Sequence, residues 1–190
     1  ILRSLNNPCP VISLNGAIIY DETGHIIYTK SMETDCVFRI IKQLKGHDLN
    51  YDVVTSRSVY KVGSLNRLLE IHEASSQSVD LKLLANGIEN GHVILMSENK
   101  LYHLVKEEML DVYKIVIYSD NVPFLEELSC ELRETEEVEV TSSATINIEL
   151  NAVGVSKGRA LTYLANHHGY SLQDFVSVGE SLNDLSMFQS

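Results

Sequence analysis

The C-terminal part of the sequence restricts the possible folds more than any other part, because strand and helix patterns alternate there. Residues 145–150 alternate polar and apolar side chains as a strand does, and residues 157–168 carry apolar side chains at helical spacing. Ser156 can cap the predicted helix, and Gly169 can end it. Residues 174–178 predict a further strand, which is followed by a polar loop and the start of a helix. This order of elements is typical of an α/β fold.

The middle of the chain differs, because it contains hairpin patterns as well as helix patterns. One hairpin is predicted over residues 17–28, with Gly24 in its turn, and a second over residues 138–150. The other predictions are strands at 10–14, 51–55, 92–97 and 113–118, and helices at 34–45 and around 65–72, 79–84 and 123–132. The strand at 10–14 is apolar enough for a buried strand of a parallel sheet. Residues 100–104 fit either a strand or a helix that continues through Met109.

These patterns predict two parts in the chain. The simplest arrangement is an α/β core made of residues 1–17 and 153–190, with an α+β insert of residues 18–152. The first residues look like the tail of an element that began earlier, and the last look like the first turns of a helix without an end signal. We therefore expect the chain to be a piece of a longer protein.

Charge and composition exclude several classes of protein. The 190 residues carry a formal charge of −11, which disfavours nucleic acid and anionic membranes as partners but still allows a small anionic substrate. No apolar run approaches the roughly 20 residues that a transmembrane helix needs. Cys9, Cys36 and Cys130 are widely spaced and form no CxxC motif. They predict free thiols in a reducing cytoplasm rather than a disulfide or a metal site.

Five polar residues fall where an open α/β sheet binds its ligands, beyond the C-terminal ends of its strands. Asn15 and Glu180 each follow a predicted strand. Asn183 and Asp184 lie where the next helix begins, and free backbone N–H groups there favour an anion. Lys157 is unusual, because a cation in the first turn of a helix opposes the helix dipole. A bound phosphate or neighbouring carboxylates would explain this lysine.

Four of these residues also have a simpler interpretation. Asn183 and Asp184 fit ordinary helix caps. Lys157 fits a solvated surface lysine, and Glu180 fits a plain loop carboxylate. Their fixed places within one α/β frame instead predict a combined site for an anion and a divalent cation.

Three stretches of the sequence carry a resemblance to a known family. "ISLNGAIIYDETGHIIY", "GVSKGRALTYLA" and "VGESLNDLSMF" resemble, in this order, the Cof-type phosphatases of the haloacid dehalogenase (HAD) superfamily with a type IIB cap. The resemblance implies a Rossmann-like HAD core with an inserted α+β cap domain. It also implies a Mg²⁺-dependent phosphatase that acts on sugar phosphates or other small phosphomonoesters through a phospho-aspartyl intermediate.

The resemblance also implies roles for single residues. Lys157 matches a lysine that neutralises the phosphate and the nucleophile, and Asp184 matches an aspartate that supports the metal and this lysine, so these two are the expected catalytic residues. Glu180 falls where the family has a Mg²⁺-ligating aspartate, so Glu180 and Asp184 are the expected metal residues. The expected phosphate-binding residues are Lys157, Asn183 and Asn15 of the NGA turn.

Two departures from the family pattern affect the expected activity. The sequence contains no DxD motif, which in this family supplies the nucleophile and the general acid/base, so we expect this motif upstream of Ile1 and no turnover by the chain alone. Glu180 is one methylene longer than the usual aspartate, which fits either weakened Mg²⁺ binding or a tolerated change. A non-catalytic sugar-phosphate-binding or interaction protein, and a related phosphotransferase or mutase, remain as alternatives.

Overall fold

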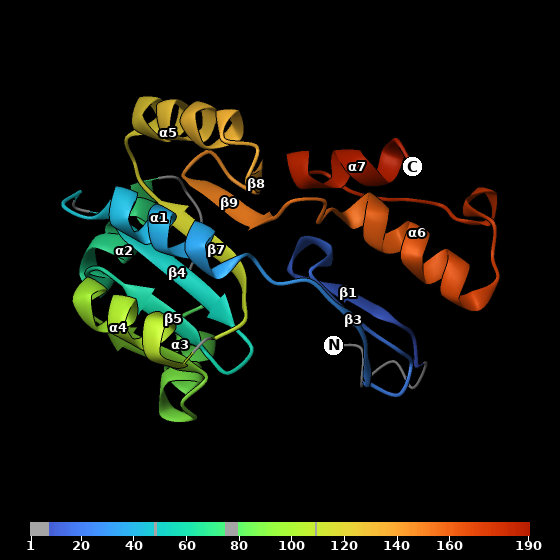
Figure 1. Cartoon of the computed structure of the whole chain (residues 1–190), viewed down its shortest axis with the longest axis horizontal. Coiled ribbons are helices and arrows are strands. Elements are labelled where there is room, and N and C mark those ends of the chain that lie inside the picture. Colours follow the sequence, from blue (N-terminus) through green and yellow to red (C-terminus); the bar gives the residue numbers. More distant parts are fainter. Residues whose placement is uncertain (1–7, 48, 75–79, 109) are drawn as a thin grey trace.

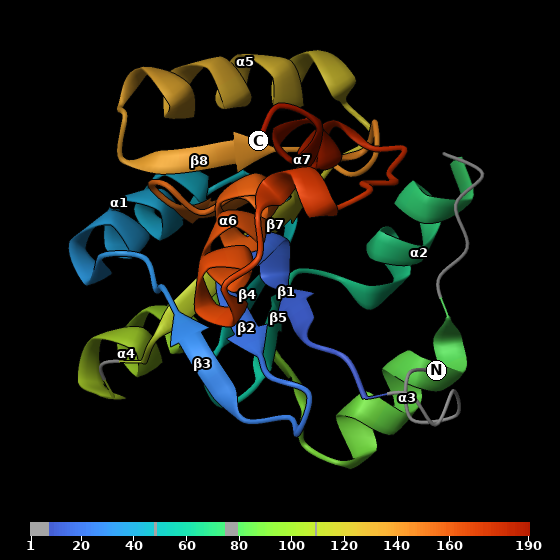
Figure 2. The same cartoon turned by 90° about the vertical axis from the view of Figure 1, so that its right-hand side faces the viewer.

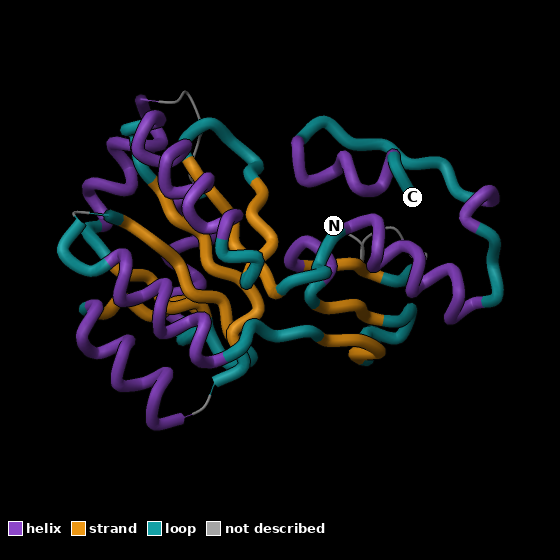
Figure 3. Tube along the Cα trace, turned by 45° about the horizontal axis from the view of Figure 1, so that its top comes forward, coloured by secondary structure: helices purple, strands orange, loops and turns teal. Residues whose placement is uncertain are grey.

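The computed structural model describes residues 8–47, 49–74, 80–108 and 110–190. Figure 1 shows two lobes side by side, and Figure 3 shows that each lobe is built around strands. One lobe contains a six-stranded sheet with helices around it, and the other contains a three-stranded sheet with the last helices of the chain. No helix of the described residues is both long and apolar enough to cross a membrane.

The three-stranded sheet is an antiparallel meander. Its strands are β1 (Val11–Ser13), β2 (Ile18–Tyr20) and β3 (Ile26–Thr29), in that spatial order. The predicted hairpin around Gly24 is confirmed, since β2 pairs with β3. The expectation of a buried strand in a parallel sheet at residues 10–14 is wrong, because β1 is half-buried and pairs antiparallel with β2. The chain turns back at Asn15 and Gly16 straight after β1, so β2 is the neighbour that β1 meets first.

The six-stranded sheet has the spatial order β6-β5-β4-β7-β9-β8. Its strands are β4 (Asn50–Thr55), β5 (Val59–Val62), β6 (Val93–Met96), β7 (Val112–Tyr118), β8 (Val138–Thr141) and β9 (Asn147–Ala152). All pairs are antiparallel except β5 with β6. The second predicted hairpin is therefore confirmed, although β9 begins at Asn147, two residues later than predicted.

One face of this sheet packs on three helices, α1 (Thr34–Leu44), α4 (Glu98–Glu108) and α5 (Val122–Glu134). The core-facing side chains of α1 are those that the helical spacing predicts, Val37, Ile40, Ile41 and Leu44. In α4, Leu101 and Val105 enter the same core as Tyr51 of β4, whose hydroxyl donates to Glu98 at 3.4 Å. The helical alternative for residues 100–104 is therefore the correct one, while Met109 lies outside the described residues.

The opposite face of the sheet is more polar. Neighbouring strand residues point to opposite faces, so Asp52 turns away from Tyr51. There Lys61 donates to both oxygens of Asp52, and Tyr118 lies against His72 of α2 (Leu65–Ala74) with 5.6 Å between ring centroids. Figure 2 shows α2 and α3 (Leu81–Glu89) on the opposite side of the strands from α1 and α4.

The second lobe is completed by α6 (Lys157–His168), α7 (Leu185–Phe188) and two short 3₁₀ turns, Leu172–Asp174 and Leu182–Asp184. Ser156 caps α6 and Gly169 ends it with a φ of 73°, both as predicted. The predicted strand at residues 174–178 is wrong. After the first 3₁₀ turn this segment has no regular structure, and Val176 and Val178 are 92% and 87% exposed. In the described chain these apolar side chains have no adjacent strand to pair with, and a strand pattern alone does not supply one.

The predicted division into residues 1–17 with 153–190 and an insert of residues 18–152 stays a prediction. The strand pairing groups β2 and β3 with β1 in the smaller sheet, while all six strands of the larger sheet lie within residues 50–152. The chain passes between the two sheets at residues 30–33 and again at residues 153–156. These two crossings bring the N-terminus of α6 close to the turn after β1.

Candidate functional site

The site is built where three segments meet: the turn after β1, the first turn of α6 and the loop that begins at Gly179. Glycines permit this close approach. A Cβ at Gly16 would lie 2.5 Å from the carbonyl oxygen of Ser156, and a Cβ at Gly179 would lie 2.5 Å from Cβ of Asp184. Gly16 also has a φ of 106°, a conformation that residues with a Cβ rarely adopt. The sequence therefore allows backbone contact between segments that are far apart in the chain.

Lys157 forms the cationic centre of the site. Its Nζ donates to Oδ1 of Asn183 at 2.9 Å and forms an ion pair with Oδ1 of Asp184. The side chain is 27% exposed, so it is held in place yet reachable from solvent. The unusual cation in the first turn of α6 is thus balanced by a carboxylate from a neighbouring segment, as the sequence suggests.

Asp184 uses both of its carboxylate oxygens inside the protein. Oδ1 faces Lys157, and Oδ2 accepts from the backbone N–H groups of Glu180 and Ser181, each at 3.0 Å. The hydrogen bond from Lys157, followed by that from the Ser181 backbone, lowers the pKa of Asp184 below its ordinary value of 3.8. Asp184 therefore does not cap α7 with its side chain. One oxygen completes a capping box with Ser181 around the turn Leu182–Asp184, and the other forms the charge pair with Lys157.

The arrangement of oxygen ligands decides which residues suit a magnesium ion. Mg²⁺ in proteins is usually held by one or two carboxylates together with waters and substrate phosphate oxygens. Glu180 is exposed at the start of the loop, whereas the oxygens of Asp184 are already engaged. No group of three or more His, Cys, Asp or Glu side chains suited to a metal occurs in the part of the chain that the structure describes. Of the two expected metal residues, Glu180 therefore has the more exposed carboxylate, and a role for either residue in binding Mg²⁺ stays a prediction.

Asn15 is buried directly behind this centre. It has a φ of 62° and a ψ of 14°, the left-handed conformation that asparagine adopts more readily than most residues. Its Nδ2 donates to Glu149 at 2.8 Å and to Asn151 at 3.0 Å, with a longer contact to Thr141 at 3.3 Å. Its Oδ1 accepts from Nδ2 of Asn183 at 3.4 Å. The amide of Asn15 is thus occupied by protein groups on both sides.

Two residues near the site, Glu149 of β9 and Lys114 of β7, escape sequence reasoning. Glu149 accepts from Lys114 Nζ at 2.8 Å and from Ser143 Oγ at 2.7 Å, as well as from Asn15. Burial acts to raise the pKa of Glu149, but the charge of Lys114 and these hydrogen bonds outweigh it and hold the pKa below its ordinary value. In the sequence, the alternating pattern of this strand indicates only that Glu149 faces away from the apolar core.

The structure brings four of the five predicted site residues into one hydrogen-bonded group: Lys157, Asn183, Asp184 and Asn15. Glu180 joins this group through its backbone N–H, while its side chain is exposed. The roles assigned to these residues in phosphate and metal binding stay predictions.

Comparison with known families and curated proteins gives matches along the whole chain. A family model described as haloacid dehalogenase-like hydrolase matches residues 1–190. Phosphatase YwpJ of Bacillus subtilis (strain 168) is 29% identical over 189 residues, which cover 95% of this chain and 66% of that protein. The 5-amino-6-(5-phospho-D-ribitylamino)uracil phosphatase YwtE of the same organism is 27% identical over 192 residues, covering 95% and 65%. The chain therefore spans a little under two thirds of the length of these relatives.

Solved structures show the same fold. A haloacid dehalogenase-like hydrolase from B. subtilis superposes with a TM-score of 0.80 at 28% identity, covering all of this chain and 69% of that one. The HAD subclass IIB sugar phosphatase BT4131 superposes with a TM-score of 0.74 at 16% identity, covering 98% and 63%. The predicted α/β class, with a Rossmann-like HAD core and an inserted α+β cap domain, is confirmed by these neighbours.

Proposed function

Because the chain belongs to the haloacid dehalogenase-like hydrolase family, we propose that the complete protein is a Mg²⁺-dependent phosphatase of small phosphomonoesters. The proposed reaction proceeds through a phospho-aspartyl intermediate, with its nucleophile in a DxD motif that these 190 residues do not contain. The chain of 190 residues alone is then expected to lack turnover. Its contribution is the charge-neutralising and metal-binding side of the site.

The observation that carries the proposal is the environment of Lys157. An ammonium group has three protons. In the described residues, Asn183 and Asp184 take two of them, which leaves one for a phosphate oxygen. Phosphoryl transfer depends on fixed positive charge beside the equatorial oxygens of the transferred group, and a lysine locked by two partners costs little reorganisation. Lys157 is therefore proposed as the catalytic cation, with Asn183 beside the same phosphate.

The metal roles are proposed from whether the carboxylate oxygens of each residue already accept hydrogen bonds in the described residues. Glu180 would hold Mg²⁺, and Asp184 would fix the positions of the loop and of Lys157 relative to the ion. When bound, the ion would neutralise charge on the phosphate oxygens. Glu180→Asp in the complete protein would shorten this ligand. A lower Mg²⁺ concentration for half-maximal activity would support weakened binding by Glu180, and an unchanged value would support a tolerated change.

The proposed substrate class rests on the relatives. YwtE is named for a phosphorylated ribitylaminouracil, BT4131 is described as a sugar phosphatase, and a further relative from Escherichia fergusonii is an HMP-PP phosphatase. All three names describe small phosphorylated metabolites, so sugar phosphates and similar monoesters are the proposed substrates. The free thiols of Cys9, Cys36 and Cys130 suit the proposed cytoplasmic location.

The test is an assay of the complete protein on p-nitrophenyl phosphate and a panel of sugar phosphates. We expect phosphate release that needs Mg²⁺ and stops with EDTA. Phosphate release at the background rate, with or without Mg²⁺, would count against an enzyme.

A second candidate is a non-catalytic sugar-phosphate-binding or interaction protein derived from the HAD fold. Glu180 favours it, since the longer side chain changes the ligand geometry of an ion that tolerates little variation in distance. Calorimetric binding of a sugar phosphate without any turnover by the complete protein would support this candidate. Transfer of the phosphoryl group to a second sugar instead of water would indicate a phosphotransferase or mutase.

A further inference from the structure

A row of hydrogen bonds extends from the site to residues that have no part in the proposed reaction. It runs from Lys157 through Asn183 and Asn15 to Glu149, and it ends at Lys114. The first three residues belong to the smaller lobe and the last two to the six-stranded sheet. The row therefore joins the proposed phosphate cation to the middle of the other lobe.

The charged groups at Glu149 and Lys157 determine which group donates and which accepts in each hydrogen bond of this row. A carboxylate only accepts hydrogen bonds, and an ammonium group only donates them. Because Glu149 Oε2 lies 2.8 Å from Asn15, the NH₂ group of Asn15 must face Glu149, and its carbonyl oxygen must face Asn183. Asn183 then turns its NH₂ group to Asn15 and its oxygen to the ammonium of Lys157.

Asn151 selects the same orientation independently. Its Nδ2 donates to the backbone oxygens of Leu14 at 3.1 Å and Tyr113 at 2.8 Å. Its own Oδ1 is thereby turned toward Nδ2 of Asn15, 3.0 Å away. Two neighbours that are themselves fixed therefore require Asn15 to present its NH₂ group to the larger sheet.

The Lys114–Glu149 pair is well removed from solvent, with side chains 12% and 6% exposed. Removing two charges from water costs about as much as their attraction returns, so a buried ion pair seldom adds net stability over an apolar pair of similar size. The stability of the fold therefore does not explain why Lys114 and Glu149 are charged residues. The orientation of Asn15 gives a reason, because the carboxylate of Glu149, together with Oδ1 of Asn151, fixes that amide.

We propose that Glu149, held in place by Lys114, is a positioning residue for Lys157. It keeps Asn15 and Asn183 in the one orientation that places a carbonyl oxygen, rather than an NH₂ group, against the ammonium of Lys157. This inference rests on the proposed phosphatase function. With the acceptor of Glu149 removed, Asn151 and Thr141 are the remaining acceptors of the Asn15 NH₂ group, so the orientation that turns the Asn183 oxygen to the ammonium is less strongly favoured.

The test replaces both charges at once in the complete protein. Lys114→Met with Glu149→Leu leaves neither charge stranded, and buried pairs of this kind tolerate apolar replacement. We expect kcat to fall on the order of tenfold, as for other residues that orient a functional group, with KM close to that of the wild type.

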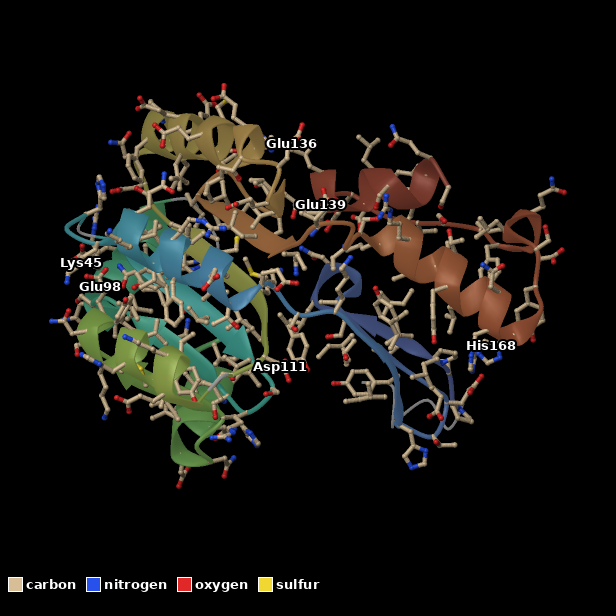
Figure 4. All side chains as sticks on the ribbon, viewed as in Figure 1. Lys45, Glu98, Asp111, Glu136, Glu139 and His168 are labelled. Carbon is tan, nitrogen blue, oxygen red and sulfur yellow. The ribbon has the colours of Figure 1, made fainter. Side chains whose placement is uncertain are left out.

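Two matched variants separate orientation from charge. Lys114→Met with Glu149→Gln keeps an acceptor oxygen without stranding a charge and should recover most of the activity. Glu139→Gln, at the edge of the six-stranded sheet facing the other lobe (Figure 4), removes one negative charge nearby. Glu139 accepts from the Gly154 backbone at 2.7 Å and touches neither Asn15 nor Asn183, so its replacement by glutamine should leave kcat and KM unchanged.

The outcomes are separable. A double variant with kcat within about twofold of the wild type would overturn the inference. If the complete wild-type protein has no phosphatase activity, the proposed function fails, and the through-hydrogen-bond NMR coupling from Asn15 Nδ2 to the carboxyl carbon of Glu149 then decides on the positioning role. If the double variant does not fold, the through-hydrogen-bond NMR coupling from Asn15 Nδ2 to the carboxyl carbon of Glu149 decides in the unmodified protein, and its absence overturns the inference.

Discussion

At the scale of single residues, Lys157 has an ammonium group on which several opposing influences act. The start of α6 disfavours a cation there, while the carboxylate of Asp184 and the carbonyl oxygen of Asn183, 2.9 Å away, favour it. Asp184 in turn depends on two backbone N–H groups of its own loop. The charges of the site are therefore balanced by the loop that begins at Gly179 and not by α6 alone.

Removal of this cation tests the proposed catalysis. In the complete protein, Lys157→Met keeps most of the length of the side chain but removes the charge that would face the phosphate. We expect kcat/KM for p-nitrophenyl phosphate to fall by about 10²–10³, the usual effect of removing one group that stabilises developing charge. Lys45→Met, a change at the distant end of α1 (Figure 4), is the control and should leave kcat/KM unaltered. Equal activity of both variants would remove Lys157 from the mechanism.

The lowered pKa of Asp184 predicts how stability depends on pH. The pKa is below 3.8 in the folded chain, so the ionised carboxylate stabilises the fold fully above that value. The stabilisation is lost as the pH falls through the lower folded pKa. We expect the difference in free energy of unfolding between wild type and Asp184→Asn to be constant near neutral pH and to shrink below about pH 4. Urea unfolding at several pH values measures it, and a difference that grows on acidification would contradict the assigned interactions.

At the scale of elements, α6 is the helix on which the smaller lobe is assembled. Tyr163 donates to the backbone oxygen of Ile27 at 2.9 Å, which attaches the helix to the β2–β3 hairpin. On another side, the N–H of Gly158 donates to Ser186 Oγ at 3.1 Å, which attaches it to α7. A Cβ at Gly158 would collide with the backbone oxygen of Ser186. The glycine is thus required by the contact between two helices, not by its own backbone.

Because of this contact, replacing Gly158 by alanine should change the free energy of unfolding in the direction opposite to that expected from helix propensity. Gly158→Ala would ordinarily stabilise a helix by about 1 kcal/mol. Here we expect a loss of about 1–3 kcal/mol in the free energy of unfolding, because the methyl group forces α6 and α7 apart. Asn166→Ala on the exposed side of α6 is the control and should be neutral or slightly stabilising. Denaturant titration compares the two, and a stabilised Gly158→Ala protein would show that the helices separate without cost.

The elements that the sequence predicts correctly are those that depend only on residues close together in the chain. The apolar spacing of α1, the cap at Ser156 and the hairpin around Gly24 depend on residues a few positions apart. Residues 174–178 show the opposite case, since a strand exists only where another strand lies beside it. Glu149 was missed for a similar reason, because its partners Asn15 and Lys114 lie 134 and 35 positions away in the sequence.

At the scale of the whole molecule, two lobes are joined by two crossings that are both hydrogen-bonded. In the first crossing, Lys30 N donates to Ala17 O at 2.8 Å and Met32 N donates to Val112 O at 2.7 Å. In the second, Gly154 N donates to Glu139 of β8 at 2.7 Å. Each crossing is therefore tied to the six-stranded sheet close to the site, so a ligand bound at Lys157 would stabilise both lobes together.

Ligand binding should consequently raise the stability of the complete protein as a unit. A ligand at about 100 times its Kd adds about 2.7 kcal/mol to the free energy of unfolding if it binds only the folded state. We expect inorganic phosphate with Mg²⁺ to raise Tm in a single transition, and Lys157→Met to abolish the rise. Sodium chloride at equal ionic strength is the necessary control, because a chain with a net charge of −11 is also stabilised by screening. An equal rise with sodium chloride would mean that no site is occupied.

The contact between Asn15 and Asn183 also has a consequence for the order of folding. The two residues are 168 positions apart, and a loop of that length costs roughly 2 kcal/mol more chain entropy to close than one of about twelve residues. The β2–β3 hairpin and α6 can form from neighbouring residues, whereas the Asn15–Asn183 contact must wait for both ends of the described chain to meet. Binding competence should therefore be the last property to appear during refolding, after the far-ultraviolet circular dichroism signal has already recovered.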